Sequence, residues 1–172
     1  MNKKLSIKEL NRVSIEEFKT SKKNSIIIVL EDVRSFNNVG SVFRTADAFA
    51  IEKIILTGIS PRPPHREIRK TALGASESVN WTYHKSCLET IKEYKKLDYK
   101  IFAIEQTSDS ISLNNFVYNK EPVVLVFGNE VSGVSQEVID ICDSSLEIPQ
   151  FGTKHSLNVS VSCGVVLWHL VK

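Results

Sequence analysis

The sequence is poor in cysteine, and its cysteines lack the spacing of a metal site or a disulfide framework. Cys87, Cys142 and Cys163 lie far apart in a chain of 172 residues. Their number is odd and no Cys-x-x-Cys occurs, so neither a disulfide scaffold nor a zinc site is indicated. The four histidines show no metal-ligand spacing either. We therefore expect three reduced, partly buried thiols and no metal.

Long apolar runs are also missing. No stretch approaches the roughly 20 apolar residues that a membrane-spanning helix needs. The first residues, Met-Asn-Lys-Lys-Leu, lack the apolar segment of a secretion signal. Hydrophobic residues make up 42% and charged residues 24% of the chain, which is typical of one soluble globular domain. We expect a cytoplasmic protein without membrane attachment.

A strong charge of one sign is absent too, because the formal net charge is only +2. Locally the balance differs. The first 23 residues carry seven Lys or Arg, among them Arg12, against three Glu, and a second basic cluster consists of Arg62, Arg66, Arg69 and Lys70 beside His65. Such clusters can follow RNA phosphates. Solvated helix faces explain each of them equally well, so both interpretations stay open.

What the sequence does contain is an alternation of strands and helices. Apolar runs rich in β-branched residues predict strands at 25–30, 53–57, 100–104, 122–127 and 145–148. Helical periodicity predicts helices at 39–50, 88–95, 134–142 and 155–170, and a capping box at 14–17 opens a short helix within the first 22 residues. This alternation predicts an α/β fold with a mostly parallel sheet flanked by helices. The last helix is apolar on nearly every side, which suits burial in the core or against a partner chain.

In open parallel sheets ligands bind beyond the carboxyl ends of the strands, which directs attention to three loops. In the first, residues 37–44, Asn38 suits a helix N-cap and Arg44 falls inside the following helix. An arginine in an otherwise apolar helix needs a partner. That partner is either an acid such as Glu31, Asp32 or Asp47, or a ligand.

The second loop, residues 128–133, places an Asn-Glu pair between two glycines directly after a buried strand. It is either a turn ended by a glycine or a backbone cradle for a nucleoside, with Glu130 meeting a hydroxyl or an arginine. The spacing matches neither the Gly-x-Gly-x-x-Gly of dinucleotide binders nor a P-loop, which disfavours a Rossmann enzyme and an NTPase.

The third loop, residues 148–158, leads into the last helix. Ser156 suits an N-cap. That simple role fits Asn158 less well, because asparagine gains little inside an apolar helix.

Together the three loops resemble the three motifs of the SpoU (TrmH-type) RNA methyltransferases of the SPOUT superfamily. The matching stretches are Asn38-Val39-Gly40 with Arg44-Thr45-Ala46, then Phe127-Gly128-Asn129-Glu130 with Ser132-Gly133, and finally Ile148-Pro149, Gly152 and Ser156-Leu157-Asn158-Val159. The resemblance covers roughly residues 25–170. It implies transfer of a methyl group from S-adenosyl-L-methionine to a ribose 2′-hydroxyl of RNA.

The resemblance also implies a deep trefoil knot at the C-terminal end of the sheet and a homodimer whose active site takes residues from both chains. The chain would then divide into a short basic helical segment, residues 1–22, and a catalytic domain, residues 23–172. The departures from the family pattern are Gln150-Phe151 after Ile-Pro, and Lys154-His155 where an acidic or polar residue is frequent.

Residue roles carried over from the resemblance fall into three sets. The catalytic set is Arg44, Asn38, Glu130, Ser156 and Asn158. The cofactor set is Phe127, Gly128, Asn129, Gly133, Ile148, Pro149, Ser156 and Leu157. The RNA-binding set, which combines the resemblance with the basic clusters, is Arg12, Arg44, Arg62, Arg66 and Lys154.

We expect Arg44 to clamp an RNA phosphate, because a guanidinium stays protonated and is a poor general base. The phosphate or a transiently neutral Arg44 then takes the proton of the 2′-hydroxyl. Because the reaction needs a 2′-hydroxyl, the substrate is RNA and not DNA. We favour tRNA over rRNA as the substrate. The alternatives are a non-catalytic knotted RNA-binding protein and a generic nucleotide-dependent α/β enzyme.

Overall fold

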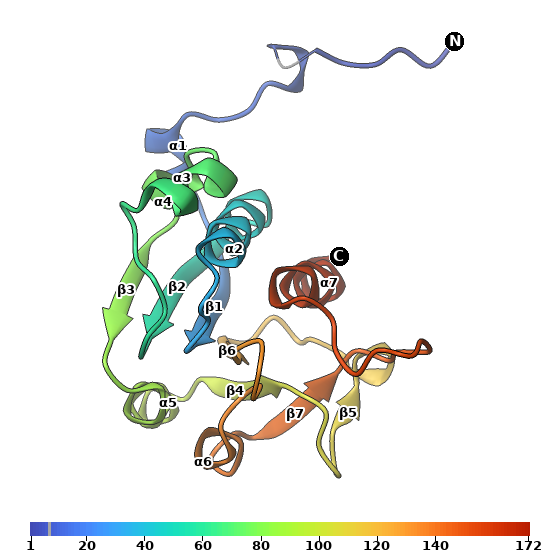
Figure 1. The fold of residues 1–172 in the computed structure, drawn as a ribbon. Coiled ribbons are helices and arrows are strands. Elements are labelled where there is room, and N and C mark those ends of the chain that lie inside the picture. Colours follow the sequence, from blue (N-terminus) through green and yellow to red (C-terminus); the bar gives the residue numbers. More distant parts are fainter. Residues whose placement is uncertain (7) are drawn as a thin grey trace.

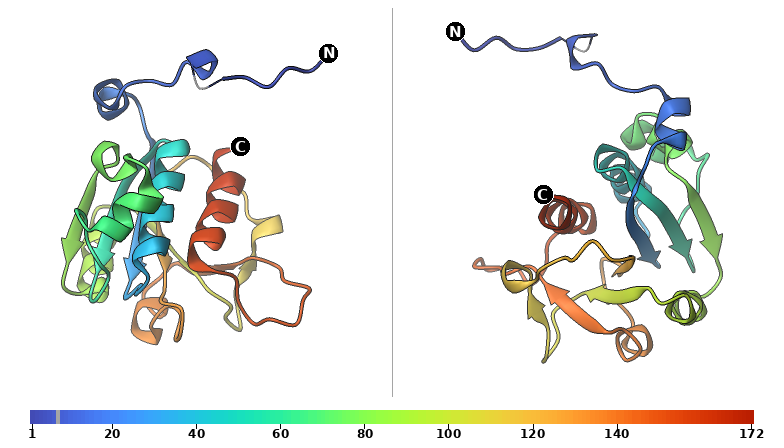
Figure 2. Two further views of the ribbon diagram at one scale, coloured as in Figure 1. Left: turned by 45° about the horizontal axis from the view of Figure 1, so that its top comes forward. Right: turned by 180° about the vertical axis from the view of Figure 1, so that it is seen from behind.

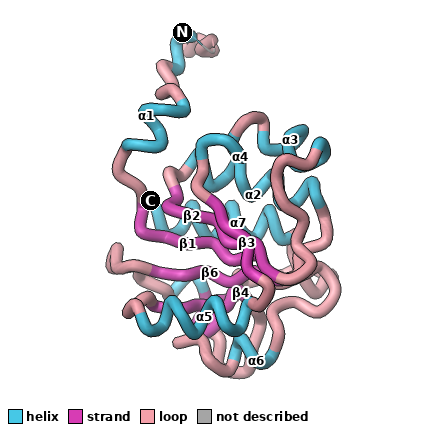
Figure 3. The backbone as a smooth tube through the Cα atoms, turned by 90° about the vertical axis from the view of Figure 1, so that its left-hand side faces the viewer, coloured by secondary structure: helices cyan, strands magenta, loops and turns pink. Residues whose placement is uncertain are grey.

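The computed structural model describes residues 1–6 and 8–172, and its centre is a parallel sheet of seven strands in the order β3-β2-β1-β6-β4-β7-β5. Every pair of neighbouring strands runs parallel. The strands are β1 (Asn24–Glu31), β2 (Ile51–Thr57), β3 (Trp81–His84), β4 (Lys100–Ile104), β5 (Ile111–Ser112), β6 (Val123–Phe127) and β7 (Ser144–Glu147). Figure 1 shows the sheet twisting strongly from β3 to β5, and Figure 3 shows β1, β2, β3, β4 and β6 from another side.

Helices cover both faces of this sheet. The α-helices are α1 (Ile15–Thr20), α2 (Phe36–Ala48), α3 (Arg66–Ala72), α4 (Ala75–Ser78), α5 (Cys87–Lys96), α6 (Gln136–Ile139) and α7 (Val159–Val171), with 3-10 turns η1 (Lys8–Leu10) and η2 (Leu113–Asn115). Helices α2 and α7 lie side by side over one face, and α5 and α6 lie on the other (Figures 1 and 2). The N-terminal segment leads away from this body, as both views of Figure 2 show.

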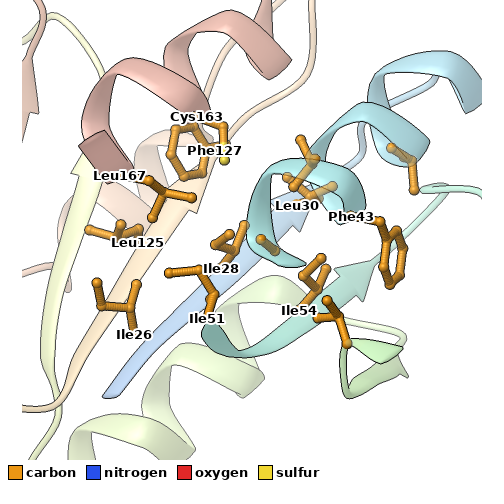
Figure 4. Close-up of a cluster of buried hydrophobic side chains, with 14 of the residues drawn as sticks. Ile26, Ile28, Leu30, Phe43, Ile51, Ile54, Leu125, Phe127, Cys163 and Leu167 are labelled. Atoms are coloured by element: carbon orange, nitrogen blue, oxygen red, sulfur yellow. The ribbon is translucent and has the colours of Figure 1, made fainter. Parts of the chain in front are cut away.

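Two hydrophobic clusters explain why the central strands read as unbroken apolar runs. Ile26, Ile28 and Leu30 of β1 point into the cluster beneath α2 and α7. Ile27 and Val29, between them, point into the cluster beneath α5 and α6. Because successive side chains of a strand face opposite ways, a strand covered on both faces must be apolar at every position. Figure 4 shows the first cluster, with Phe43, Cys163 and Leu167 of the helices packed on the strands.

The structure confirms the α/β fold and all five predicted strands, and it adds β3 and β5, which the sequence did not reveal. Both are short: β3 carries partly polar residues and β5 has two residues. The helix predicted at 134–142 is reduced to α6, and turns complete that stretch. The capping box is confirmed, since Ser14 accepts from the Glu17 N–H and the Glu17 carboxylate accepts from the Ser14 N–H.

The three cysteines are free, with Cys87 and Cys163 buried and Cys142 half-buried, as expected. Burial raises the pKa of Cys163 to about 12, so this thiol stays protonated and unreactive at neutral pH. None of the helices in the described residues is both long and apolar enough to cross a membrane.

Candidate active site

A cavity of about 710 Å³ lies at the carboxyl edge of the sheet, lined by the second and third loops and the residues after β4. No residue of the first loop, which lies wholly within the described residues, belongs to this lining. Its apolar lining comes from strand ends and loops, and includes Ile104, Phe127, Leu146, Ile148 and Leu157. Its polar lining includes Glu105, Gln106, Glu147, Ser156 and Ser162. The volume lies within the range of ordinary small-molecule sites, and the position follows the rule for open parallel sheets.

A chain of hydrogen bonds joins one residue from each loop. The Asn38 amide donates to Glu130 Oε1 at 2.9 Å, and the Asn158 amide donates to Asn38 Oδ1 at 3.1 Å. The second carboxylate oxygen of Glu130 accepts from the Arg34 N–H at 3.3 Å. Asn38 and Glu130 are 92 residues apart in sequence, and Asn158 is 120 residues from Asn38. The fold therefore brings three of the five residues of the catalytic set into direct contact.

The capping roles expected for two loop residues are wrong in detail. Ser35, and not Asn38, caps α2, because its hydroxyl accepts from the Asn38 N–H at 3.2 Å. Asn158, and not Ser156, caps α7, where its Oδ1 accepts from the Ser160 N–H at 2.9 Å. Asn38 thus lies inside the first turn with its side-chain amide free to bridge the other two loops. Asn158 fills both roles at once, capping through its oxygen and donating to Asn38 through its nitrogen.

The second loop is a closed turn built around Asn129. Its Oδ1 accepts from the N–H groups of Val131 and Ser132, each at 2.9 Å. The backbone of Asn129 also exchanges hydrogen bonds with Gly133, at 3.2 and 3.0 Å. Asn129 therefore shapes the wall of the cavity chiefly through its backbone and this turn.

Both glycines of this loop are required by geometry. A Cβ on Gly128 would lie 1.9 Å from the Gly133 carbonyl carbon. Gly133 has a φ of 67°, and a Cβ there would lie 2.1 Å from a carboxylate oxygen of Glu105. Because glycine has no Cβ, the two ends of the turn can touch and the Glu105 carboxylate can approach Gly133.

Two carboxylates bind the residues that follow this loop: Glu31, expected only as a possible partner of Arg44, and Glu105, which the sequence did not indicate. Glu31, only 6% exposed, accepts from the Ser135 N–H at 2.9 Å and from the Ser135 hydroxyl at 2.7 Å. Glu105 accepts from the Val134 N–H at 3.1 Å. The available signal was an acidic residue ending an otherwise apolar strand, since a buried carboxylate must be satisfied by donors.

Glu130 is a carboxylate held in its charged form. Partial burial acts to raise the pKa of Glu130. Hydrogen bonds from its own backbone N–H, from Asn38 and from Arg34 outweigh that effect, and the pKa falls below its ordinary value. A carboxylate with a lowered pKa is a weak base. This favours an orienting role for Glu130 over proton abstraction.

In the third loop, Ser156, Leu157 and Ile148 line the cavity as the cofactor set requires, whereas Pro149 does not. The Gln106 amide donates to the His155 carbonyl at 2.7 Å, which ties this loop to the end of β4. Phe151 is 95% exposed and projects from the loop. Of the cofactor set, Phe127, Gly128, Asn129 and Gly133 also line the cavity.

Arg44 is exposed on α2 and lies outside the cavity lining. The salt bridges suggested for it are wrong, because no carboxylate in the described residues lies within 4.0 Å of it. Asp47 instead accepts from Ser78 and Asp32 from the Ile59 N–H, while Glu31 is bound to Ser135. Arg44 therefore has no ion-pair partner among the described residues, and its side chain is exposed to solvent.

The remaining RNA-binding candidates are spread over the surface. Arg12 precedes α1 on the N-terminal segment, Arg66 begins α3, and Lys154 lies in the third loop. Arg62 lies over the ring of Tyr83, 4.2 Å from its centroid. All four are exposed, and none has an acidic partner in residues 1–6 and 8–172.

The cavity suits a nucleoside that carries a charged amino-acid tail. Apolar side chains from β6, β7 and the third loop offer faces for a flat base, and the turn of residues 128–133 forms the wall beside them. The carboxylates of Glu105 and Glu147 lie on the same lining and match a positively charged group. The side chains present therefore fit S-adenosyl-L-methionine. In the described residues, no group of three or more potential ligands is placed to hold a metal ion.

The parallel sheet and the cavity at its carboxyl edge define an α/β protein that binds a nucleoside-sized ligand. Comparison with known proteins identifies its family. The chain belongs to the SpoU rRNA Methylase family, whose family model matches residues 25–168. The family expected from the three motifs is thereby confirmed.

Individual relatives cover most of the chain. The tRNA (guanosine(18)-2′-O)-methyltransferase of Aquifex aeolicus is 28% identical over 160 residues, covering 90% of this chain and 72% of the relative. The 23S rRNA (guanosine-2′-O-)-methyltransferase RlmB of Haemophilus influenzae is 29% identical, covering 96% and 67%. The crystal structure of an AdoMet-bound rRNA methyltransferase from Sinorhizobium meliloti superposes with a TM-score of 0.79 at 26% identity, covering 87% of this chain and 56% of that one.

Proposed function

We propose that this protein transfers a methyl group from S-adenosyl-L-methionine to a ribose 2′-hydroxyl of RNA. The observation that carries the proposal is the hydrogen-bonded chain Glu130–Asn38–Asn158 at the rim of a cavity that fits the cofactor. Relatives named as tRNA and rRNA 2′-O-methyltransferases support it. A non-catalytic RNA-binding protein is the less favoured alternative, because the residues of the three motifs are present and most of them converge.

The cofactor would lie against Phe127, Ile148 and Leu157, beside the turn that Gly128 and Gly133 allow to close. When bound, S-adenosyl-L-methionine supplies a methyl group on a positively charged sulfur. The chain must then align the ribose and remove its proton. Alignment alone can contribute about 7–11 kcal/mol in favourable intramolecular cases.

The division of roles follows from the contacts. Glu130 fixes Asn38 in one rotamer, and Asn38 with Asn158 and Ser156 presents polar groups to the ribose. Arg44 clamps the RNA phosphate through paired N–H groups. The proton of the 2′-hydroxyl passes to that phosphate or to a transiently neutral Arg44.

Arg44 lies outside the cavity lining of its own chain, so it can act at a cofactor site only if that site belongs to a second subunit. We propose a homodimer for that reason. Helix α7 exposes Val161 (51%), Val165 (39%) and Trp168 (65%) at the spacing of one helical face. Helix α7 lies next to α2, the helix that carries Arg44 (Figure 1), and the Trp168 ring is 6.3 Å from that of Phe49 at the end of α2. Association of two such faces buries the apolar stripe and supplies each site with the partner subunit's Arg44.

Three finer proposals accompany this one. The loop of residues 148–158 is proposed to complete a trefoil knot with the second loop. The basic segment of residues 1–22 is proposed to form a separate RNA-gripping arm beside a catalytic domain of residues 23–172. We favour tRNA as the substrate because this small basic arm resembles that of compact tRNA-acting members, and we place the reaction in the cytoplasm, where such RNA is modified.

A methyl-transfer assay tests the proposed function. The protein is incubated with labelled S-adenosyl-L-methionine and either total tRNA or total rRNA, beside Arg44→Ala and Lys96→Ala. Lys96 is an exposed cation on α5, on the far side of the sheet, and serves as the matched control. We expect label in RNA with the wild type and Lys96→Ala, and a loss of 100-fold or more with Arg44→Ala. Equal transfer by Arg44→Ala would reject its role, and no transfer to either RNA by the wild type would reject the enzyme.

A further inference from the structure

A second cavity, of about 890 Å³, opens at the carboxyl edge of the sheet beside the candidate active site. Its lining comes from the start of α2, the loop after β2 and the strand β3. None of the roles assigned above uses it as a site. What we infer for it rests on the proposed function and adds a contact to the RNA.

The cavity has aromatic walls. Phe36, Trp81 and Tyr83 line it together with His65 and Arg62. The rings of Phe36 and His65 are 4.0 Å apart, tilted by 34°, and the Arg62 guanidinium lies 4.2 Å from the centroid of the Tyr83 ring. Phe36 is nevertheless 37% exposed, so part of its ring is open to a ligand. Flat surfaces of this kind stack on nucleobases.

The floor of the cavity is held rigidly. The Ser60 hydroxyl, 3% exposed, donates to the Leu30 carbonyl at 3.0 Å and accepts from the Val33 N–H at 3.0 Å. Asp32 accepts from the Ile59 N–H at 2.8 Å, and the Tyr83 hydroxyl donates to the Gly58 carbonyl at 3.0 Å. The loop after β2 is therefore fixed to the end of β1, and a ligand would meet a preformed surface.

One cation, Arg62, lines the cavity, and further basic residues follow on α3. Residues 58–70 contain four Arg or Lys and one acid, Glu67. Arg62 and Arg66 are exposed and have no acidic partner in the described residues. Aromatic walls with Arg62 on the lining and Arg66 next to His65 match a nucleotide, whose phosphate is anionic and whose base is flat.

The segment 34–38 connects this cavity with the candidate active site. The Arg34 N–H and the Asn38 amide both bind Glu130, while Phe36, between them, lines the second cavity. Phe36 and Asn38 lie in the first turn of α2 but about 200° apart around its axis, so their side chains face different sides of the helix. An RNA strand that uses both places would pass around the start of α2, with one nucleotide on each side.

We propose that the second cavity binds an unstacked nucleobase of the substrate RNA next to the nucleotide that is methylated. The base stacks on Phe36, and Arg62 and Arg66 bind its phosphate. Because the walls also contact the edges of the base, this cavity contributes to the choice of target sequence.

Fluorescence of 2-aminopurine tests this directly, because stacking quenches its emission. The full-length protein, saturated with S-adenosylhomocysteine, is titrated with a single-stranded RNA hexamer that carries 2-aminopurine at each internal position in turn. The variants are Phe36→Leu, which removes the ring, Phe36→Tyr, which keeps it, and Arg62→Ala, with Lys96→Ala as the control for lost surface charge. Calorimetry with S-adenosylhomocysteine reports on the first cavity in every variant.

We expect quenching at one position with the wild type, and binding about tenfold or more weaker with Phe36→Leu, since stacking of one base is worth roughly 1–3 kcal/mol. Phe36→Tyr should restore both, and Lys96→Ala should change neither. Affinity for S-adenosylhomocysteine should stay at its wild-type value in all of them. Equal quenching and affinity in the wild type, Phe36→Leu and Arg62→Ala would overturn the proposal.

Methyl transfer to total tRNA and rRNA, measured on the same preparations, separates the two proposals. Transfer by the wild type with quenching that does not depend on Phe36 rejects the base site and leaves the enzyme intact. Phe36-dependent quenching without any transfer supports the base site and rejects the enzymatic function.

Discussion

Gly128 is the position at which the smallest side chain should have the largest effect on the first cavity. In the Gly128→Ala variant the added Cβ would lie 1.9 Å from the Gly133 carbonyl carbon and 2.1 Å from both the Gly133 oxygen and the Val134 nitrogen. All three neighbours are backbone atoms of a turn, so no side chain can rotate away. The two ends of the loop must separate.

The expected cost follows from what that separation breaks. The two backbone hydrogen bonds between Asn129 and Gly133 are lost, each worth about 0.5–1.5 kcal/mol. Overpacking of a close contact typically costs about 1–3 kcal/mol, a similar value. We expect the free energy of unfolding to fall by about 1–3 kcal/mol. Because the displaced loop forms the cofactor wall, affinity for S-adenosylhomocysteine should fall by about 100-fold or more.

Gly152→Ala is the matched control, because Gly152 lies in the third loop and a Cβ there meets nothing within 4 Å. Urea unfolding gives the stability of each variant, and isothermal titration calorimetry gives the affinity for S-adenosylhomocysteine. The control should match the wild type in both. Wild-type affinity in Gly128→Ala would show that the cofactor does not depend on this loop, and the reasoning about the site would fail.

Three further predictions address the supports of the site, its pH dependence and the dimer. Ser135→Ala removes one donor to the buried carboxylate of Glu31, and we expect a loss of about 1.5–3 kcal/mol in urea unfolding; an unchanged midpoint would contradict this. Because the pKa of Glu130 is lowered, its stabilising contribution is present above the ordinary carboxyl pKa of about 4.3 and is lost only as pH falls through the lower folded value. The affinity for S-adenosylhomocysteine, measured by calorimetry, should therefore stay constant from pH 7 to about 5. If it declines within that window and Glu130→Gln abolishes the decline, the lowered pKa of Glu130 is refuted. Trp168→Glu places a charge in the apolar stripe of α7 and should convert a dimer into monomers in sedimentation velocity, whereas a wild-type monomer or a dimeric variant would exclude this interface.

The central strands were predictable because burial on both faces leaves an unmistakable apolar run, as in residues 26–30 of β1. Strand β3 was not, since Trp81, Tyr83 and His84 are only half-buried at the sheet edge and their pattern resembles a loop. The short helices α3 and α4 were not predicted either. Each buries only two residues, against α2 and neighbouring helices, which is too few to give a helical period in the sequence.

The candidate site divides in a similar way. Three motifs in order were enough to name Asn38, Glu130 and Asn158, but their mutual hydrogen bonds depend on how loops some 100 residues apart pack, which one sequence does not encode locally. The support from Glu31 was missed for the same reason, since its partner Ser135 is 104 residues away. Arg44 was identified by its motif, whereas its outward position became visible only in the fold.

A crystal structure of the protein with S-adenosylhomocysteine would test the convergence of the three loops most directly. The account predicts two subunits facing through α7, adenosine between the 128–133 and 148–157 loops, and the partner subunit's Arg44 beside the sulfur. Adenosine bound elsewhere on the sheet, or Arg44 of both subunits remote from the ligand, would contradict it.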